Sequence, residues 1–482
     1  MHSPTPDFPC PNRSLLRSTL LPLTTSIGIV LGLSGCASWL PQREASTALT
    51  VPAAWSTSAL PGASSLSSAD PTRLAQWWQR FNDPLLTTLV TQALQANTSV
   101  RAAQAALQQS RALRDVKTAG MWPGVSASGS AQRTQSGSND PSSTFKAGFD
   151  ASWEPDVFGG KRKAVNAIEA DAQAAQASLA DVQVSVAAEV ALAYIQLRGQ
   201  QAQLAVAHTN LASQNETLQI TDWRAQAGLT TSLEVEQART ASEQTGAQIP
   251  ALQASTAKTR HSLAVLTGQN PDALQALLSS TLPIPQAAGD LTLNIPAQTL
   301  RQRPDVRAAE HRISAALARV SAADAARYPS FSLGGSLSVS ALTLSGLTSG
   351  ATVVNALLGG ISVPLLDAGA AKAQVQAQEA ALEQARASYQ SAVLTALKDV
   401  EDALVALNGD RERLTRLQNA ATAAGNAALM AQQRFNSGLI DFQTVLQTQR
   451  SLLSTQDSVA STQADISADH VRLYKALGGG WN

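Results

Sequence analysis

Residues 98–104 read TSVRAAQ, and residues 304–310 read PDVRAAE, which is the same pattern 206 positions later. Further pairs match at spacings that grow slowly along the chain: Trp122-Pro123 with Tyr328-Pro329 at 206, Pro155 with Pro364 at 209, RAQAGL at 224–229 with RFNSGL at 434–439 at 210, and LTG at 266–268 with LGG at 477–479 at 211. Chance similarity does not keep a nearly constant spacing across half of a chain. These registers therefore indicate a tandem duplication.

Each half is expected to contain one long helix. Residues 160–224 contain no proline and are rich in Ala, Gln, Glu and Leu, so a continuous helix of about 98 Å is expected there. Hydrophobic residues recur every seven positions along it, at Val190, Leu197, Leu204, Leu211 and Leu218. The same phase returns 210 positions later in a second long helix, 368–435. This heptad spacing predicts coiled-coil packing with a left-handed supercoil.

Two shorter helices in each half are expected to match the long helix in length. Residues 96–121 and 231–267 would rise about 39 and about 55 Å, so stacked end to end they would span about 94 Å. Residues 304–327 and 441–477 repeat this arrangement in the second half. Pro250 is expected to kink the helix that contains it.

The N-terminus carries a targeting signal. Two arginines precede the apolar stretch 20–33, which is typical of a secretory signal peptide and is too short to be a convincing membrane-spanning helix. The stretch ends in Leu33-Ser34-Gly35-Cys36, which resembles the bacterial lipobox. We therefore expect residues 1–35 to be a signal peptide, Cys36 to be lipidated, and the Ser/Ala/Pro-rich residues 36–71 to form a tether. An ordinary signal peptide that happens to contain a cysteine is the alternative.

Composition and motif spacing exclude several classes of function. The 35 Lys+Arg residues balance 35 Asp+Glu residues, whereas a general nucleic-acid binder needs a basic face. Both cysteines lie in the first 36 residues, and the histidines of the mature chain are scattered without metal-ligand spacing. Segments 159–162 and 143–146 resemble a phosphate loop and an S-x-x-K motif, but they lack the companion residues of those motifs. We expect no enzyme activity, no cofactor, no metal site and no nucleic-acid partner.

Two segments, about 123–155 and about 329–364, are expected to form β-hairpins. Apolar and polar residues alternate in 145–154 and 330–341, whereas the partner strands 123–133 and 353–364 are less regular and leave their registers open. The residues expected to face lipid are Phe145, Phe149, Trp153, Phe331, Leu333 and Leu337. A half-buried strand in a soluble sandwich would explain the alternation equally well. Lipid is favoured because the mature chain is expected to have no apolar run long enough to span a bilayer as a helix, and because of the lipobox.

Four strands cannot close a barrel, and open sheet edges are not tolerated in hydrocarbon, so closure must come from other copies. We expect a mainly α fold with a β-barrel portion, in which three tandem-duplicated protomers form a 12-stranded outer-membrane β-barrel continued by a long periplasmic α-helical barrel. The mature chain then divides into a first repeat at 72–267, an equatorial linker at 268–303 and a second repeat at 304–482.

The chain resembles the outer-membrane efflux channel family (TolC/OprM-like), and in particular its NodT-type lipoprotein branch. The resemblance rests on the duplication, the lipobox and these motifs: Trp77-Trp78, Phe81-Asn82-Asp83-Pro84-Leu85, Glu154-Pro155-Asp156-Val157-Phe158-Gly159, Arg303-Pro304-Asp305-Val306 and the paired Gly-Leu turns. It implies a homotrimeric duct that is anchored in and spans the outer membrane. Its partners would be a periplasmic adaptor (membrane fusion) protein and an inner-membrane pump, commonly of the RND type, and its cargo small molecules such as drugs and toxic compounds.

The resemblance also implies site residues. The Gly-centred turns would form the periplasmic tip, with adaptor contacts at Ala227, Gly228, Leu229, Ser437, Gly438 and Leu439. The gate would involve Glu234, Asp441, Thr444, Gln447 and Arg450; Arg450 lies one turn further along and either faces the bore or, as we slightly favour, is simply solvated. Glu234 matches an acidic latch residue of the family, but the expected Tyr and Arg partners correspond to Phe435 and Ile440, so that latch cannot form as such. Thr444 and Gln447 are neutral where the family has aperture acids, which predicts weaker cation selectivity unless Asp441 substitutes.

Two other functions stay open. A duct for type I protein secretion has the same architecture, although the lipobox favours efflux because the secretion channels of this family usually lack it. A structural coiled-coil lipoprotein would explain the heptads, but not the amphipathic strands or the duplication.

Overall fold

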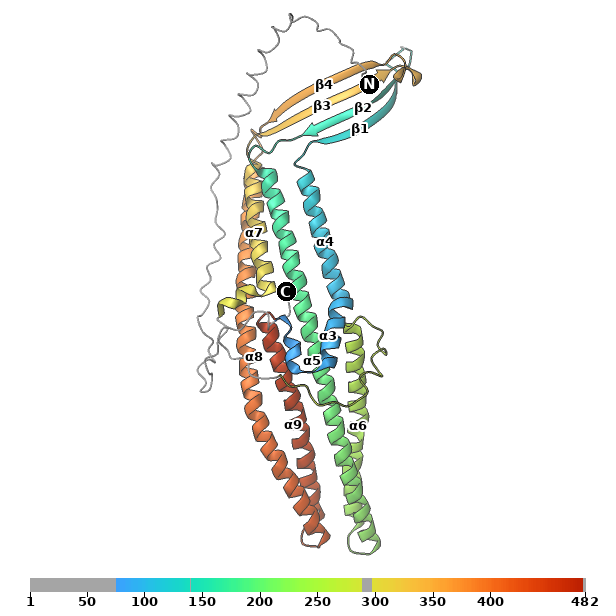
Figure 1. Cartoon of the computed structure of the whole chain (residues 1–482), viewed down its shortest axis with the longest axis vertical. Coiled ribbons are helices and arrows are strands. Elements are labelled where there is room, and N and C mark those ends of the chain that lie inside the picture. The colour runs from blue at the N-terminus through green and yellow to red at the C-terminus, as the bar shows by residue number, and fades with distance from the viewer. Residues whose placement is uncertain (1–74, 139, 288–296, 480–482) are drawn as a thin grey trace, which may run out of the picture. The chain divides into compact units, whose positions relative to one another are not determined.

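The computed structural model describes residues 75–138, 140–287 and 297–479 (Figure 1). The signal peptide, Cys36, the tether and part of the linker predicted at 268–303 lie outside the described residues. Contacts divide the chain into two compact units, and the sheet belongs to the unit that includes Val116–Asn166 and Leu317–Glu379. The second unit includes the described residues up to Asp115, Ala167–Ala316 and the chain from Ala380 onward.

The order of the elements confirms the duplication. After the 3-10 helix η3 (Trp77–Phe81) and α3 (Pro84–Ala96), the first repeat contains α4 (Thr98–Ala119), β1 (Gly124–Thr134), β2 (Ser142–Trp153), α5 (Gly160–Gln226) and α6 (Ser232–Leu266). After the 3-10 helix η4 (Ala297–Gln302), the second contains α7 (Pro304–Ala325), β3 (Ser330–Ala341), the short η5 (Ser345–Leu347), β4 (Thr352–Ser362), α8 (Ala370–Asn436) and α9 (Phe442–Ala476). The six predicted helices of the two repeats are each found within two residues of their predicted ends.

The last register of the repeat needs a correction. The sequence comparison placed 266–268 on 477–479, but Gly268 and Gly478 end α6 and α9 in the same way, with φ of +73° and +76°. These two glycines are 210 positions apart, as are the starts of α5 and α8 and of α6 and α9. The spacing is therefore constant from the long helices to the end of the repeat.

The sheet has four antiparallel strands in the order β1-β2-β3-β4, so that strands from the two repeats meet at its centre. Phe149 pairs with Leu337 and Ala127, which places their side chains on one face because directly opposite residues share a face. The opposite face carries Ser128, whose hydroxyl donates to the Asp150 carboxylate at 2.8 Å. The pairing thus fixes the registers of β1 and β4, which their irregular patterns had left open.

The main core of the helical unit forms around the middle of α5. The ring of Trp77 stacks on Tyr474 of α9 with the centroids 5.4 Å apart. The hydroxyl of Tyr194 donates to Asp83 at 2.7 Å, and Arg198 donates to that hydroxyl at 3.1 Å. Burial, together with the hydrogen bond to Asp83, raises the pKa of Tyr194 to about 12. These contacts fix the N-terminal segment against α5 and α9.

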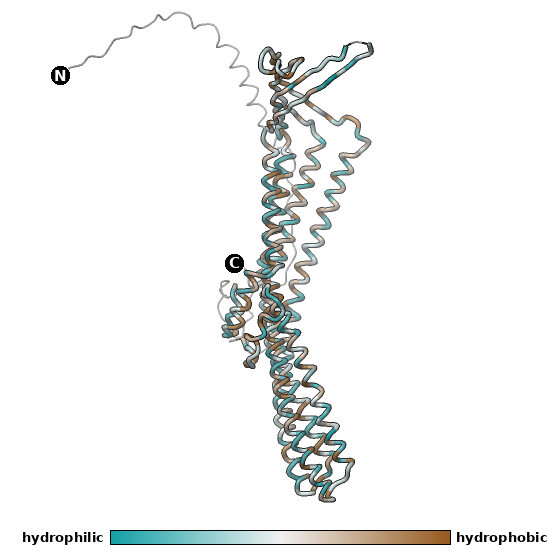
Figure 2. Tube along the Cα trace, turned by 90° about the vertical axis from the view of Figure 1, so that its right-hand side faces the viewer, coloured by the Kyte–Doolittle hydropathy of each residue, from teal (hydrophilic) through white to brown (hydrophobic). Residues whose placement is uncertain are grey.

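We expected no helix to be apolar enough to cross a membrane, and the length and composition of α5 contradict that expectation. One described helix, α5, contains an 18-residue window that is long and apolar enough, and 44% of that window is buried inside the fold. Elsewhere along the helices, hydrophobic and hydrophilic residues are intermixed (Figure 2). The buried residues of α5 include Val190, Ile195 and Leu197 of the main core, so packing within the protein accounts for much of this hydrophobicity.

The short helices are joined end to end, as their summed lengths predicted. The side chain of Asn97 caps the start of α4, where its Oδ1 accepts a hydrogen bond from the Ser99 backbone amide at 2.8 Å. The side-chain Nδ2 of Asn97 donates to the carbonyl of Leu266, the last residue of α6, at 2.8 Å. Such side-chain capping satisfies backbone groups that a helix end leaves unpaired. A Cβ on Gly268 would lie 2.5 Å from the Ala96 carbonyl oxygen, so this joint requires glycine.

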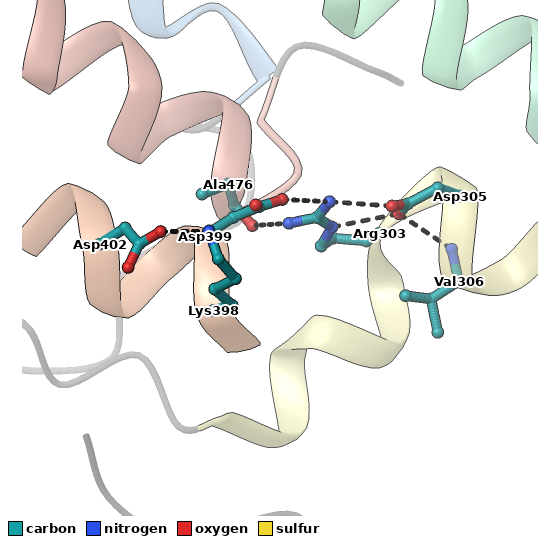
Figure 3. A network of polar contacts seen from close by, with 7 residues as sticks. All are labelled: Arg303, Asp305, Val306, Lys398, Asp399, Asp402 and Ala476. Carbon is teal, nitrogen blue, oxygen red and sulfur yellow. Dashed lines mark hydrogen bonds and ion pairs between the residues drawn. The ribbon is translucent and has the colours of Figure 1, made fainter. Parts of the chain in front are cut away.

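The second repeat makes the same joint with a charged residue. Arg303, 206 positions after Asn97, donates to the carbonyl of Ala476, the last residue of α9, at 2.8 Å (Figure 3). Its guanidinium also donates to both carboxylate oxygens of Asp305, at 2.8 and 3.1 Å, and to Asp399 of α8 at 3.3 Å. An ion pair between Lys398 and Asp402 lies alongside on α8. The two joints are thus made by residues at equivalent positions of the repeat, an uncharged asparagine in the first and a charged arginine in the second.

Candidate functional site

The first candidate surface consists of two matching helix-to-helix turns, one between α5 and α6 and one between α8 and α9 (Figure 1). Gly228 and Gly438 have φ of +73° and +71°. The Leu229 amide donates to the Arg224 carbonyl at 2.8 Å, and the Leu439 amide donates to the Arg434 carbonyl at 2.9 Å. These six-to-one hydrogen bonds are Schellman motifs, which require a left-handed residue that glycine provides without strain.

Both turns present apolar side chains to solvent. All six residues predicted to contact an adaptor are exposed: Ala227, Gly228, Leu229, Ser437, Gly438 and Leu439. The leucines are 70% and 73% exposed, although leucine is usually buried. The turns therefore form a pair of equivalent, exposed Gly-Leu surfaces on the helical unit, and their role as adaptor contacts stays a prediction.

The acidic residues predicted for the gate cap the helices that follow the turns. Glu234 accepts a hydrogen bond from the Thr231 amide at 3.0 Å at the start of α6. Asp441 accepts one from the Thr444 amide at 2.9 Å at the start of α9. Hydrogen bonds from the hydroxyl and amide of Thr444 lower the pKa of Asp441. Both carboxylates are thus occupied locally as caps, and Thr444 belongs to the second cap.

The remaining predicted gate residues lie on the exposed side of α9. Gln447 and Arg450 are both exposed. Arg450 contributes to a groove of about 370 Å³ that is lined by Gln214, Ala241, Gln244, Thr245, Gln248, Arg450, Leu453, Ser454 and Asp457. Among the described residues, no hydrogen bond or ion pair joins Gln447 or Arg450 to Glu234, so the five predicted gate residues do not form one cluster within a protomer.

Sequence reasoning missed Arg224, which lies beside the first turn. Its Nη1 donates to the Phe435 carbonyl at 2.7 Å, and its Cζ lies 4.4 Å from the centroid of the Phe435 ring. Phe435 in turn packs against Phe442, with the ring centroids 5.2 Å apart. The buried members of this small apolar cluster are Ala238, Ala241, Ala431, Phe435, Phe442, Val445 and Leu446. Phe435 therefore takes part in a contact between α5 and α8, where sequence comparison had seen only the loss of a tyrosine.

The second candidate surface is the apolar face of the sheet. Trp153 pairs with Leu333, Phe149 with Leu337 and Phe331 with Ile361. This register places all six predicted lipid-facing residues, which are Phe145, Phe149, Trp153, Phe331, Leu333 and Leu337, on the same face. Several residues on this face are strongly exposed, among them Leu357 at 81%. Exposed apolar faces of this kind mark contact with a partner or with lipid.

Among the described residues, no group of three or more His, Cys, Asp or Glu side chains could hold a metal ion. His311 and His470 lie on α7 and α9, and burial is the main cause that lowers the pKa of His311.

Comparison with known proteins gives one consistent result. The model of the outer membrane efflux protein family matches residues 89–269 and 295–479. The solvent efflux pump outer membrane protein SrpC of Pseudomonas putida is 30% identical over 469 residues, which cover 94% of this chain and 97% of the relative. The structure of the outer-membrane channel OprN has a TM-score of 0.82 and 34% identity, covering 92% of this chain and 99% of that one. The open state of the MtrE outer membrane channel of Neisseria gonorrhoeae has a TM-score of 0.80 and 26% identity, with 92% and 98% covered.

Proposed function

Because this chain belongs to the outer membrane efflux protein family, we propose that three copies of it form a passive duct through which an efflux pump expels small molecules across the outer membrane. The cargo would be small toxic compounds, the class to which the solvents named for its relative SrpC belong. The duct itself performs no chemistry and takes its energy from the pump.

The single observation that carries this proposal is the sheet. It is amphipathic, and within the described residues β1 and β4 each pair on one side only. In hydrocarbon an unpaired row of backbone amides and carbonyls is strongly unfavourable, so the two edges must pair with neighbouring copies. A four-stranded protomer then closes a barrel of about twelve strands as a trimer, a size that leaves space within the barrel.

The residues of the two sheet faces fit such a barrel. Phe149 and Leu337 would face lipid, and Ser128, Asp150 and Ser336 would face the water-filled interior. A hydroxyl-rich wall with few charges suits a duct that transmits many kinds of cargo, because it offers hydrogen bonds without selecting one charge.

The helical unit would carry the duct toward the pump. We infer that the exposed turns around Gly228 and Gly438 contact a periplasmic adaptor protein, since two equivalent Gly-Leu surfaces in each of three protomers give six similar docking points. Cys36 would carry the lipid anchor, and Glu234, Asp441 and Arg450 would act near the aperture. The pump would be of the RND type, as is common for this kind of outer-membrane component.

The test uses the full-length, lipidated protein. Purified protein should migrate as a heat-modifiable trimer and should produce discrete conductance steps in planar bilayers. A monomer without conductance would overturn the duct. A deletion strain should become more susceptible to a panel of small toxic compounds while its profile of secreted proteins stays unchanged, and loss of one secreted protein with unchanged susceptibility would point to protein secretion instead.

A further inference from the structure

An aromatic contact joins the two repeats at the end of the sheet from which the helices leave. Phe158 follows β2, and its ring stacks on Tyr328, just before β3, with the centroids 5.1 Å apart. It also stacks on Phe331, within β3, at 6.4 Å. Trp153 pairs with Leu333, so the end of β2 lies beside the start of β3. A residue that follows one strand thus packs on residues at the start of the neighbouring strand.

The repeat places equivalent residues at one outer edge of the sheet. Trp122 and Val125 lie at the start of β1, 206 positions before Tyr328 and Phe331. They are 73% and 70% exposed. Within the described residues β1 pairs only with β2, so no second strand end lies beside this pair. One half of the contact is therefore present at this edge with its apolar surface open to solvent.

The other half lies at the opposite edge of the sheet. Leu365 and Leu366 follow β4 as Phe158 follows β2. They are 92% and 95% exposed, the highest values among the large apolar side chains of the described residues. Spacings of 209 and 210 from Phe158 fall on Asp367 and Ala368, so the two leucines just before these positions replace the ring. Apolar exposure of this extent marks a surface that a partner covers.

Both surfaces are held in place by hydrogen bonds. The indole Nε1 of Trp153 donates to the carbonyl of Met121 at 3.0 Å, which fixes the backbone next to Trp122. Asp367, next to Leu366, accepts hydrogen bonds from two backbone amides around the start of α8, each at 2.9 Å. The exposed side chains are therefore presented at defined positions before any partner binds.

The pairing of the strands shows how the two hairpins of the sheet correspond. Gly124 of β1 lies opposite Ser152 of β2, and Ser330 of β3 lies opposite Ser362 of β4. Ser330 is 206 positions after Gly124, and Ser362 is 210 positions after Ser152. A contact between β2 and β3 at the centre of the sheet can therefore be transferred, residue by residue, to β4 of one copy and β1 of the next.

These spacings predict the register between copies. At the centre of the sheet, Ser152 lies opposite Gly334. The equivalent positions are Ser362 of one copy and Ser128 of the next, and both serines lie on the polar face of the sheet. This register keeps the apolar face continuous around the barrel. It also brings the end of β4 beside the start of the next β1, as the end of β2 lies beside the start of β3.

Resting on the proposed trimeric duct, we propose that Leu365 and Leu366 of one copy pack on Trp122 of the next copy where the helices leave the sheet. Val125 takes part in this contact as Phe331 does within the protomer. The occupant of each surface is a second copy of this chain, because the first repeat already makes the equivalent contact. Different surfaces of the two copies meet, and such a heterologous contact closes a ring when its rotation fits.

The experiment cross-links full-length, lipidated trimers with a short bismaleimide. In Trp122→Cys with Leu366→Cys the two introduced thiols are the only free ones, because Cys10 is expected to leave with the signal peptide and Cys36 to be acylated. Boiled samples should contain covalent dimers and trimers on a denaturing gel. The control is Trp122→Cys with Leu344→Cys, a leucine 67% exposed beyond the far end of β3. It should give about 10-fold less product or lower, since effective concentration falls steeply with distance.

A second pair of cysteines shows that the reagent spans such a contact. Phe158→Cys with Tyr328→Cys places both thiols at the contact inside one chain. Its cross-linked product should therefore migrate as a single chain. If Trp122→Cys with Leu366→Cys does not assemble, Val125→Cys with Leu365→Cys tests the same contact.

The temperature at which trimers dissociate on gels tests whether the contact holds the copies together. Trp122→Ala and Leu366→Ala should each lower this temperature, and the double variant should lower it by less than the sum, because both changes remove one contact. Leu344→Ala should leave it unchanged. Trp122→Tyr with Leu366→Phe transplants the ring pair seen inside the protomer and should keep the temperature near that of the wild type.

The outcomes distinguish the contact from the duct. Wild-type trimers whose cysteine pairs give no more cross-linked product than the control would overturn the contact and leave the duct standing. Additive effects of Trp122→Ala and Leu366→Ala would also overturn it. A dye on Leu366→Cys that nitroxide-labelled lipids quench, without cross-linking, would assign the leucines to the bilayer instead. A wild-type protein that is monomeric would overturn both the contact and the duct.

Discussion

Replacement of Arg303 by alanine should loosen the joint between α9 and α7 while leaving the rest of the helical unit folded. Arg303 is buried, and it is the only side chain in Figure 3 that bridges the end of α9, the start of α7 and α8. Its removal deprives the Ala476 carbonyl of a charged donor at 2.8 Å and leaves Asp305 and Asp399 without their shared partner.

The magnitude follows from how much water can replace Arg303. The side chains of Asp305 and Asp399 are 31% and 40% exposed, so hydration compensates much of their loss and their ion pairs contribute little after screening. The hydrogen bond to the Ala476 carbonyl is buried, and one between a charged donor and a buried acceptor contributes about 1.5–3 kcal/mol. We therefore expect the local opening free energy of the joint to fall by about 2–3 kcal/mol.

Hydrogen exchange measures this local opening without requiring the whole channel to unfold reversibly. The Leu477, Gly478 and Gly479 amides donate to the last turn of α9 and report on the joint. A fall of about 2–3 kcal/mol should speed their exchange about 30- to 150-fold. Arg301→Ala, which removes an exposed arginine two positions away, should leave it unchanged. Acceleration of less than about threefold in Arg303→Ala would refute the reasoning, as would equal acceleration in the control.

Three further predictions concern other parts of the protein. Gly268→Ala should lower the melting temperature of the trimer more than Gly228→Ala does. Both glycines have a positive φ, which costs an L-residue about 1–2 kcal/mol, but only at Gly268 would the new Cβ meet a carbonyl, 2.5 Å away; equal decreases in melting temperature would contradict this. Burial, with a smaller contribution from Asp305, raises the pKa of Asp181, so the folded state favours the neutral carboxyl and is destabilised when Asp181 ionises. Asp181→Asn should therefore raise the melting temperature more as the pH climbs from about 3.8 upward, and an increase seen only in acid would contradict this. Phe149→Lys on the apolar face should abolish insertion of the trimer into the membrane, at a cost of up to about 2–4 kcal/mol per chain, whereas Ser336→Lys on the other face should insert normally. Heat-modifiable mobility measures insertion, and the same defect in both variants would contradict the assignment of Phe149 to the lipid-facing side.

Local sequence signals were sufficient to predict the six helices of the two repeats, but α3 was not predicted. Proline-free heptads and the glycines that follow α5 and α8 gave their bounds within two residues, since these signals act within a few turns of the chain. The alternation in 145–154 and 330–341 predicted β2 and β3. The registers of β1 and β4 required the pairing itself, because Val354 and Leu358 on β4 interrupt the alternation.

The Arg224 contact and the charged joint escaped prediction for a different reason. Alignment of the repeats places Arg224 beside Arg434 and Phe435 beside Ala225, so it compares equivalent positions and does not show that Arg224 reaches Phe435. Arg303 was noticed as part of a family motif, but its role depends on the end of α9, which lies 173 positions away in sequence. Contacts between non-equivalent parts of a repeat require the folded chain.

The matched lengths of α5 and α8, 67 residues each, also bear on how such a protein arises. A single repeat carries one long, one medium and one short helix and two strands, and six copies of it would close the same ring that three duplicated chains close. The duct therefore has approximate sixfold symmetry, in the sense that six nearly equal helical hairpins surround its axis. The duplication allowed alternate hairpins to differ, with Asn97 at one joint and Arg303 at the next. In a ring of identical hairpins all contacts between neighbours are equally strong. In a ring of alternating hairpins two kinds of contact exist, so one kind can stay closed while the other separates.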